Sequence, residues 1–165
     1  MRPNLSMDFT INKETKTINV KRDFAANINL VWAAWTTSEL LEQWWAPKPY
    51  VTKTKSMDFR EGGCWHYAMV SPEGQEHWCK ADYITIEILK KFSVLDAFCD
   101  EDGNINHDFP RSNWSNSFAQ NSHTTTVSIQ IQYKELADLE KVIQLGFKEG
   151  FTMAMENLDD YFEAQ

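Results

Sequence analysis

The chain has 165 residues, of which 42% are hydrophobic and 13% aromatic, and this length and composition predict one compact domain with a sizeable core. Its formal charge of -8 argues against a nucleic-acid partner, because binding to a polyanion depends on Lys and Arg displacing condensed counterions. The N-terminus lacks the basic and apolar blocks of a secretion signal, and no apolar run approaches the roughly 18 residues needed to span a bilayer, so we expect a cytoplasmic protein without membrane insertion.

The beginning of the chain carries little pattern. Residues 1–16 are polar, and we expect a tail or a loosely held strand there, followed by a single domain over residues 17–165. Residues 17–24 alternate between apolar and polar side chains, which indicates a strand with one buried face. This strand is expected to open the fold.

A helical segment comes next. The stretch NINLVWAAWTTSELLEQWW has apolar residues at helical spacing and predicts two short helices joined near Thr36, where Thr36 and Glu39 match a capping box. Pro47 and Pro49 end the second helix, because proline cannot donate the hydrogen bond that a continuing helix needs. We therefore interpret the WWAP sequence as scaffold, with one tryptophan packed inward and the other covering the turn.

The middle of the chain is predicted to form an antiparallel sheet. Short turn sequences (EGG, SPEG and LKK) separate strand-like runs, whereas parallel strands would need crossover helices for which there is no room. The expected strands cover residues 51–59, 64–70, 77–88 and 92–99, followed by an acidic loop over 100–113 and a hairpin over 114–120 and 124–133. Apolar and polar side chains alternate cleanly along the last strand, so one of its faces is expected to be buried.

The chain closes with an amphipathic pattern that predicts one long helix over residues 138–163. Gly146 and Gly150 lie on its apolar stripe, where each costs about 1 kcal/mol relative to alanine. Their small size either lets the sheet approach closely, which we favour, or leaves room beneath the helix. The predicted class is α+β: a helix-grip fold, with a curved antiparallel sheet of six to seven strands around the long helix.

Three motifs carry a resemblance to a known family. They are ANINLVWAAWTTSELLEQWWAP, MDFREGGCWHYAMVSPEG, and the pairs Gly146-Phe147 and Gly150-Phe151. Over about residues 20–162 the chain resembles the Bet v 1-like, START-like (SRPBCC) superfamily and, within it, the family named after the activator of the ninety-kilodalton heat-shock chaperone's ATPase. The resemblance implies a cavity between sheet and long helix, in which many superfamily members hold apolar small molecules or lipids. It does not imply one reaction.

The strand after Gly62 and Gly63 is the best candidate for a cavity wall. Trp65, Tyr67 and Met69 share one face of this strand at a period of two. The preceding DFREGG sequence is interpreted as scaffold, because glycine permits the positive φ of a tight hairpin. The predicted ligand-contacting residues are Trp65, Tyr67, Met69, Trp78, Phe98, Phe147 and Phe151.

Residues for catalysis or metal binding are not evident. The three cysteines are widely spaced and the four histidines show no ligand pattern, so we expect reduced, partly buried thiols, no metal and no cofactor. His66 and Tyr67 are neighbours in a strand and point in opposite directions. Asp96 would be an acid or base if it faced inward, but such a residue more often faces solvent, so no catalytic residue is predicted.

Three functions remain open. The first is a noncatalytic domain that binds an apolar or aromatic small molecule under the long helix. The second is an interaction module that stimulates a chaperone ATPase, and the third is a polyketide cyclase or hydrolase that uses a buried carboxylate or tyrosine. The protein is expected to be a monomer, or a homodimer through its edge strands.

Overall fold

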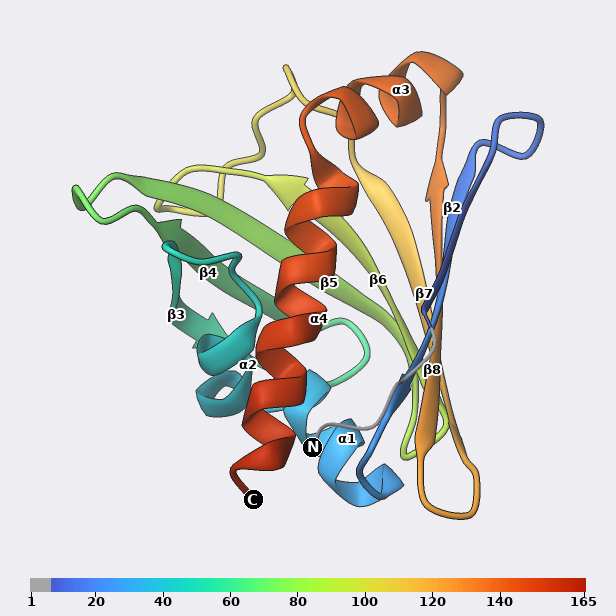
Figure 1. Ribbon diagram of the computed structural model, residues 1–165. Helices are drawn as coiled ribbons and strands as arrows, with labels where there is room; N and C mark the ends of the chain where they lie inside the picture. Colours follow the sequence, from blue (N-terminus) through green and yellow to red (C-terminus); the bar gives the residue numbers. More distant parts are fainter. Residues whose placement is uncertain (1–6) are drawn as a thin grey trace.

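An eight-stranded antiparallel sheet dominates the computed structural model, which describes residues 7–165 (Figure 1). Its strands are β1 (Met7–Asn12), β2 (Thr17–Phe24), β3 (Val51–Met57), β4 (Cys64–Val70), β5 (Glu76–Glu87), β6 (Lys91–Phe98), β7 (Ser112–Gln120) and β8 (Thr125–Tyr133). They follow one another in space as β1-β2-β8-β7-β6-β5-β4-β3, and every neighbouring pair is antiparallel. The predicted α+β helix-grip class is confirmed.

The strand count differs from the six to seven that were predicted. The additional strand is β1, in the polar N-terminal stretch, where it pairs with β2 from Met7 opposite Arg22 to Asn12 opposite Thr17. Most β1 side chains are exposed, so the strand lacks the buried alternating face that identifies a strand in a sequence. Backbone pairing, rather than burial, defines it.

The described residues contain four helices: α1 (Ile28–Thr36), α2 (Ser38–Trp44), α3 (Leu136–Gln144) and α4 (Phe147–Glu163). The two short helices after the strand over residues 17–24 are as expected. The prediction of a capping box formed by Thr36 and Glu39 is wrong. Thr37 precedes α2 without a side-chain cap, and the Thr36 hydroxyl donates to the carbonyl oxygen of Trp32 at 2.8 Å. Asn27 caps α1, where its Oδ1 accepts from the backbone N–H of Leu30 at 3.0 Å.

The predicted single C-terminal helix is two helices, which is a second correction. Gly146 adopts φ +89°, a left-handed conformation that glycine tolerates without a steric cost, and the chain changes direction there. The apolar periodicity continues through this break, because both helices place their apolar faces toward the same sheet. Periodicity alone therefore did not reveal the interruption.

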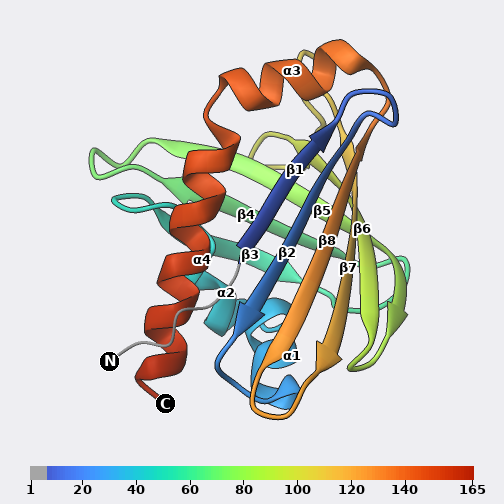
Figure 2. The same ribbon diagram turned by 45° about the vertical axis from the view of Figure 1, so that its right-hand side comes forward.

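Helix α4 lies across the concave face of the sheet, with α3 at one end and the short helices α1 and α2 at the other (Figures 1 and 2). Its C-terminal half is fixed by polar contacts. A buried ion pair joins Asp159 to Arg22 on β2, and the Asn157 amide donates to the carbonyl oxygens of Trp44 at 3.3 Å and Ala46 at 3.1 Å. Its N-terminal half borders a cavity instead.

The tight turn between β3 and β4 needs glycine for steric reasons. A Cβ atom at position 63 would lie 2.1 Å from the backbone oxygen of Asp58, and Gly62 has φ +86°. Asp58 and Arg60 pair at 2.6 Å at the surface of this turn. The interpretation of DFREGG as scaffold agrees with this geometry.

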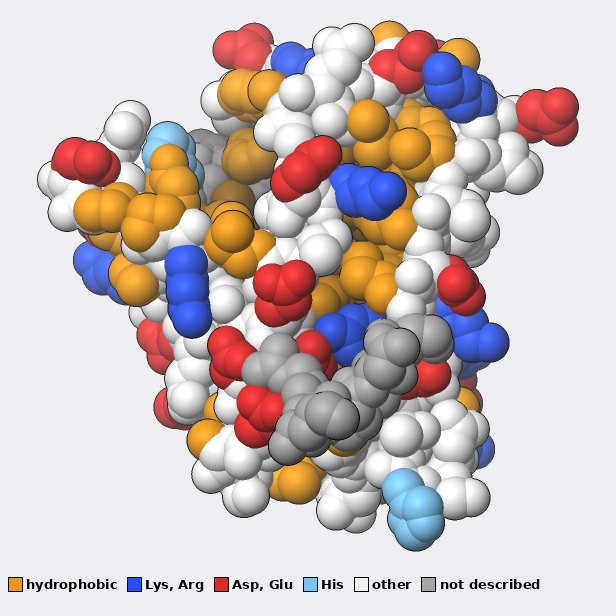
Figure 3. All heavy atoms as spheres, in the orientation of Figure 1, with side chains coloured by type: hydrophobic (Ala, Val, Ile, Leu, Met, Phe, Trp, Pro, Cys, Tyr) orange, Lys and Arg blue, Asp and Glu red, His pale blue; other side chains and the backbone are white. Residues whose placement is uncertain are grey.

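Apolar side chains are visible on both sides of α4, and a hollow lies beside the helix on the side of β4 and β5 (Figure 3). Within residues 7–165, no helix is both long enough and apolar enough to cross a membrane.

A candidate ligand cavity between the sheet and the C-terminal helix

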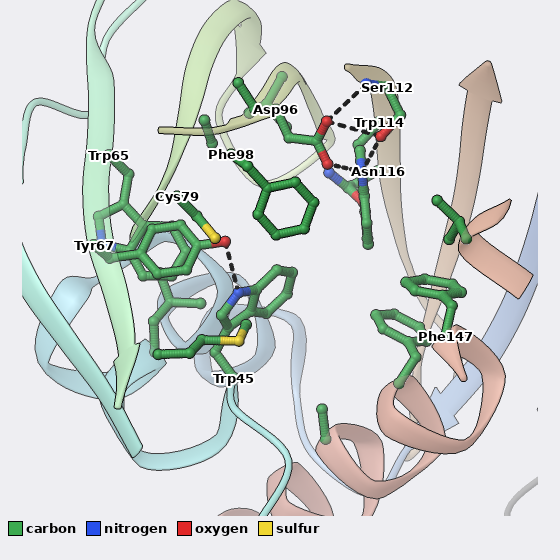
Figure 4. A pocket seen from close by; sticks show the side chains of 18 of the residues that line it. Trp45, Trp65, Tyr67, Cys79, Asp96, Phe98, Ser112, Trp114, Asn116 and Phe147 are labelled. Atoms are coloured by element: carbon green, nitrogen blue, oxygen red, sulfur yellow. Dashed lines mark hydrogen bonds between the residues drawn. The ribbon is translucent and has the colours of Figure 1, made fainter. Parts of the chain in front are cut away.

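A cavity of about 300 Å³ lies between the inner face of the sheet and the N-terminal half of α4 (Figure 4). Strands β4 to β7 form its floor, while α1, α2 and the loop after α2 close one end. Aromatic and aliphatic side chains make up most of the lining, and they come from elements far apart in the sequence. A space of this size is at the small end of those that hold small-molecule ligands.

Six of the seven predicted contact residues line this cavity: Trp65, Tyr67, Met69, Phe98, Phe147 and Phe151. The rings of Trp65 and Tyr67 stack with centroids 3.8 Å apart on β4. Those of Phe147 and Phe151 stack at 5.3 Å on α4, on the opposite side of the space.

Trp78 was predicted to contact the ligand, but it does not line the cavity. It pairs with Ala68 across β4 and β5, and residues directly opposite in an antiparallel pair point to the same side of the sheet. That side is the outer one, where Trp78 packs against the ring of His66 at 5.1 Å. Cys79, Ala81 and Tyr83 are the β5 residues that line the cavity.

Trp45 is a cavity residue that the sequence analysis missed. Trp44 is buried, and its indole N–H donates to the carbonyl oxygen of Ala34 at 3.0 Å, as a scaffold residue would. The indole of Trp45 instead faces the cavity and donates to the Tyr67 hydroxyl at 3.1 Å (Figure 4). The angle of about 100° between adjacent helical residues was a usable signal, because it sends two neighbouring rings to different partners.

The Tyr67 hydroxyl and the Cys79 thiol form a buried polar spot on the β4–β5 wall. Burial raises the pKa of Tyr67 well above its ordinary value, and the nearby Cys79 thiol adds to this effect. Burial likewise raises the pKa of Cys79 to about 12. Both groups are therefore neutral at pH 7, and neither is an activated nucleophile.

Asp96 faces the cavity from β6, contrary to the more common outward orientation on which the sequence analysis relied. One carboxylate oxygen accepts from the backbone N–H and the hydroxyl of Ser112, at 2.7 and 2.8 Å, and the other accepts from the Trp114 indole at 3.0 Å. Burial raises the pKa of Asp96, although the bonds from Ser112 and Trp114 oppose that effect. This carboxyl is the most polar group in the lining.

Two buried polar atoms of the lining lack a hydrogen-bond partner among the described residues. They are the indole Nε1 of Trp35, on α1, and the amide Oδ1 of Asn116, on β7. Both side chains are almost completely buried. Neither residue was predicted to contact a ligand. Trp35 has the sequence position of an ordinary core residue in an amphipathic helix.

The cavity opens beside Phe98, whose side chain is 44% exposed. Its ring packs on Phe109, from the loop before β7, at 5.1 Å, and the Lys141 ammonium of α3 lies 4.7 Å from the centre of the Phe109 ring. Gly150 and Pro47 line the cavity beside each other, and a Cβ atom at position 150 would be in ordinary contact with the proline Cγ at 3.7 Å. The small size of Gly150 leaves room beneath α4, the less favoured of the two explanations.

A comparison of the chain with models of protein families identifies its family. The family model described as "Activator of Hsp90 ATPase homolog 1-like protein" matches residues 25–163. The chain belongs to this family. The resemblance drawn from the sequence motifs is thereby confirmed.

Solved structures show the same architecture as this member of the Hsp90-activator-like family. A Mycobacterium smegmatis protein superposes with a TM-score of 0.86 at 27% identity, over 95% of this chain and 96% of that one. An Arthrobacter aurescens protein gives a TM-score of 0.90 at 23% identity, over 96% and 92% of the two chains. None of the curated proteins matches the sequence.

The chemistry of the cavity in this family member depends on the side chains that line it. In the described part of the chain, no group of three or more His, Cys, Asp or Glu side chains is placed to hold a metal ion. His66 lies on the outer face of the sheet, where its Nε2 is 3.1 Å from the backbone oxygen of Asp100. The cavity therefore combines apolar walls with a few fixed hydrogen-bonding groups.

Proposed function

We propose that the protein binds an apolar small molecule, with an aromatic or lipid-like skeleton, in the cavity beneath α4. The observation that carries this proposal is the apolar space of about 300 Å³ inside a domain of only 165 residues. Protein interiors are otherwise packed as densely as organic crystals, so an unfilled apolar space of this size costs stability. A ligand that fills it would recover part of that cost.

The distribution of polar groups supports a binding role. The hydroxyl of Tyr67 and the carboxyl of Asp96 come from different strands, β4 and β6, and each accepts a hydrogen bond from a neighbouring tryptophan indole. Such groups fix the orientation of an apolar molecule, while the aromatic rings supply the contact area. A cytoplasmic location, as expected from the sequence, would give access to metabolites of this kind.

Mass spectrometry of the purified protein, first under native and then under denaturing conditions, would detect a molecule released on unfolding. In solution, the neutral fluorescent probe N-phenyl-1-naphthylamine should bind with one probe per chain. The absence of both a released compound and probe binding would contradict the proposal.

A cavity-filling variant makes the test specific to this site. Gly150→Leu should abolish binding of the probe, because a leucine side chain at this position must extend past Pro47 into the cavity. Gly150→Ala is the matched control, since its methyl group meets only ordinary contacts and should leave binding nearly unchanged. Equal binding by both variants would place the probe elsewhere on the molecule.

One observation favours an enzyme as the second candidate, of the polyketide cyclase or hydrolase type. Asp96 is a buried carboxyl at a ligand cavity, with a raised pKa, which suits a general acid or base. A substrate that turned over with the native protein but not with Asp96→Asn would support this alternative.

The family description favours a third candidate, stimulation of a chaperone ATPase. The ATP turnover of a cognate chaperone, measured with an excess of this protein, tests it directly. No change in turnover would remove this candidate and leave the ligand-binding proposal unaffected.

A further inference from the structure

Unpartnered polar atoms at one end of the cavity point to the chemistry of its ligand, and this inference rests on the proposed function. Within residues 7–165, three buried side-chain nitrogen or oxygen atoms have no hydrogen-bond partner: Trp35 Nε1, Asn116 Oδ1 and Thr52 Oγ1. Two of these three belong to residues that line the cavity, and Thr52 does not. Such orphaned atoms are rare in folded proteins, and each is costly unless something else satisfies it.

Trp35 and Asn116 belong to the same end of the cavity. Asn116 lies between Trp114 and Phe118 on the inner face of β7, and the Phe118 ring is 6.0 Å from the ring of Trp35. The side chains of Asn116 and Trp35 are 2% and 3% exposed, so bulk water does not reach them freely.

Asp96 marks the other end. It accepts hydrogen bonds from Ser112, which lies four residues or about 13 Å of strand before Asn116 on β7, and from the indole of Trp114, two residues before Asn116. The Asp96 carboxylate accepts three hydrogen bonds, whereas the amide oxygen of Asn116 and the indole N–H of Trp35 have no partner among the described residues. Of the two ends, only the Trp35–Asn116 end therefore has described polar atoms that are buried without a hydrogen-bond partner.

The chemistry of the two orphaned atoms is complementary. An indole N–H can only donate a hydrogen bond, and an amide oxygen can only accept one. A ketone or ether oxygen would satisfy Trp35 alone. A hydroxyl group accepts from one and donates to the other, and it would also serve if the Asn116 amide were turned to present its NH₂ group.

We infer that the cavity takes an apolar molecule carrying a hydroxyl group, with that hydroxyl seated at the Trp35–Asn116 end. The apolar skeleton then lies between the stacked rings on β4 and those on α4. The hydroxyl enters first, and the skeleton extends toward the opening beside Phe98.

The test compares two probes of nearly equal shape, 2-naphthol and 2-methylnaphthalene, by displacement of N-phenyl-1-naphthylamine. The quantity of interest is the ratio of their dissociation constants, methyl over hydroxyl. In Asn116→Leu this ratio should fall about tenfold relative to the wild type, because the hydroxyl loses a buried partner. Trp35→Phe, which keeps an aromatic ring but removes the donor, should lower the ratio in the same direction.

Thr52→Val is the matched control, because it removes the remaining orphaned atom without touching the cavity. Its ratio should equal that of the wild type. An unchanged ratio in both Asn116→Leu and Trp35→Phe would overturn the inference, as would a ratio that falls only in Asp96→Asn. Those results presuppose that the displaced probe binds, so failure of the probe to bind, together with no compound released on unfolding, would refute the proposed function instead.

Discussion

At the scale of single residues, the protein places a few polar groups where apolar packing would be expected. Asp96 is the extreme case, since its carboxyl faces an aromatic cavity and depends on Ser112 and Trp114 for its hydrogen bonds. Removing an ion from water is costly, and the three bonds offset only part of that cost. The arrangement therefore leaves a measurable dependence of stability on pH.

We expect the wild type to lose stability relative to Asp96→Asn as the pH rises from about 4 to 7. The unfolded carboxyl has a pKa of about 3.9 and the folded one a higher pKa, so between these values the native state binds more protons. The free energy of unfolding must then fall with increasing pH, and the variant lacks this contribution. Urea denaturation of both proteins across this range measures the difference, and a difference independent of pH would contradict the expected cause.

At the scale of elements, the C-terminal segment consists of parts with different roles. The left-handed Gly146 separates α3 from α4, and the buried contacts of Asn157 and Asp159 hold the second half of α4 to the rest of the domain. Phe147, Gly150 and Phe151 near the start of α4 face the cavity instead. One helix is thus both a clamp and a cavity wall.

The two glycines of this segment should respond in opposite ways to alanine. Gly150→Ala is expected to raise the free energy of unfolding by up to about 1 kcal/mol, because the position is helical and has room for a methyl group. Gly146→Ala should lower it by about 1–2 kcal/mol, because φ +89° strains any residue with a Cβ atom. Chemical denaturation monitored by tryptophan fluorescence compares them, and stabilisation by both changes would mean that Gly146 is not fixed in this conformation.

The ion pair between Arg22 and Asp159 is expected to hold α4 against β2. Both side chains are only 7% exposed, so Arg22→Met should cost about 3–5 kcal/mol, because it removes the Arg22 cation from the buried Asp159 carboxylate. The double variant Arg22→Met with Asp159→Leu should regain most of this loss, because no charge then remains buried. If the double variant were as unstable as the two single changes added together, the pair would not be the source of the cost.

At the scale of the whole molecule, a single cluster of buried side chains connects the sheet, the short helices and α4. The rings of Trp32 and Trp35 on α1 reach Phe118 on β7, while Phe151 on α4 reaches Trp114 on the same strand. No layer has a separate core in the described part of the chain.

We therefore expect one cooperative unfolding transition. Far-ultraviolet circular dichroism and tryptophan fluorescence should give the same denaturation midpoint, because helices and aromatic clusters lose their packing together. Two separate midpoints, with the helical signal lost first, would show that α4 detaches from the sheet before the core unfolds.

Most of the fold could be predicted from the sequence. Alternating and helical periodicities located the two short helices and the strands from β2 onward, because burial of one face imposes those patterns. The family motifs and the inner face of β4, with Trp65 and Tyr67, were also readable. For the N-terminal residues the sequence left a tail and a loosely held strand as alternatives, and it did not reveal the break at Gly146, since backbone pairing and a single left-handed residue leave the hydrophobic pattern unchanged.

The composition of the cavity depends on contacts between elements that are distant in sequence. Trp78 and Cys79 exchange sides with a one-residue change of register, and nothing local to β5 fixes that register. The inward direction of Asp96 and the partners of Trp45 likewise depend on Ser112, Trp114 and Tyr67, which are distant in sequence. A polar atom without a partner, such as Asn116 Oδ1, can be recognised only after every neighbouring element is in place.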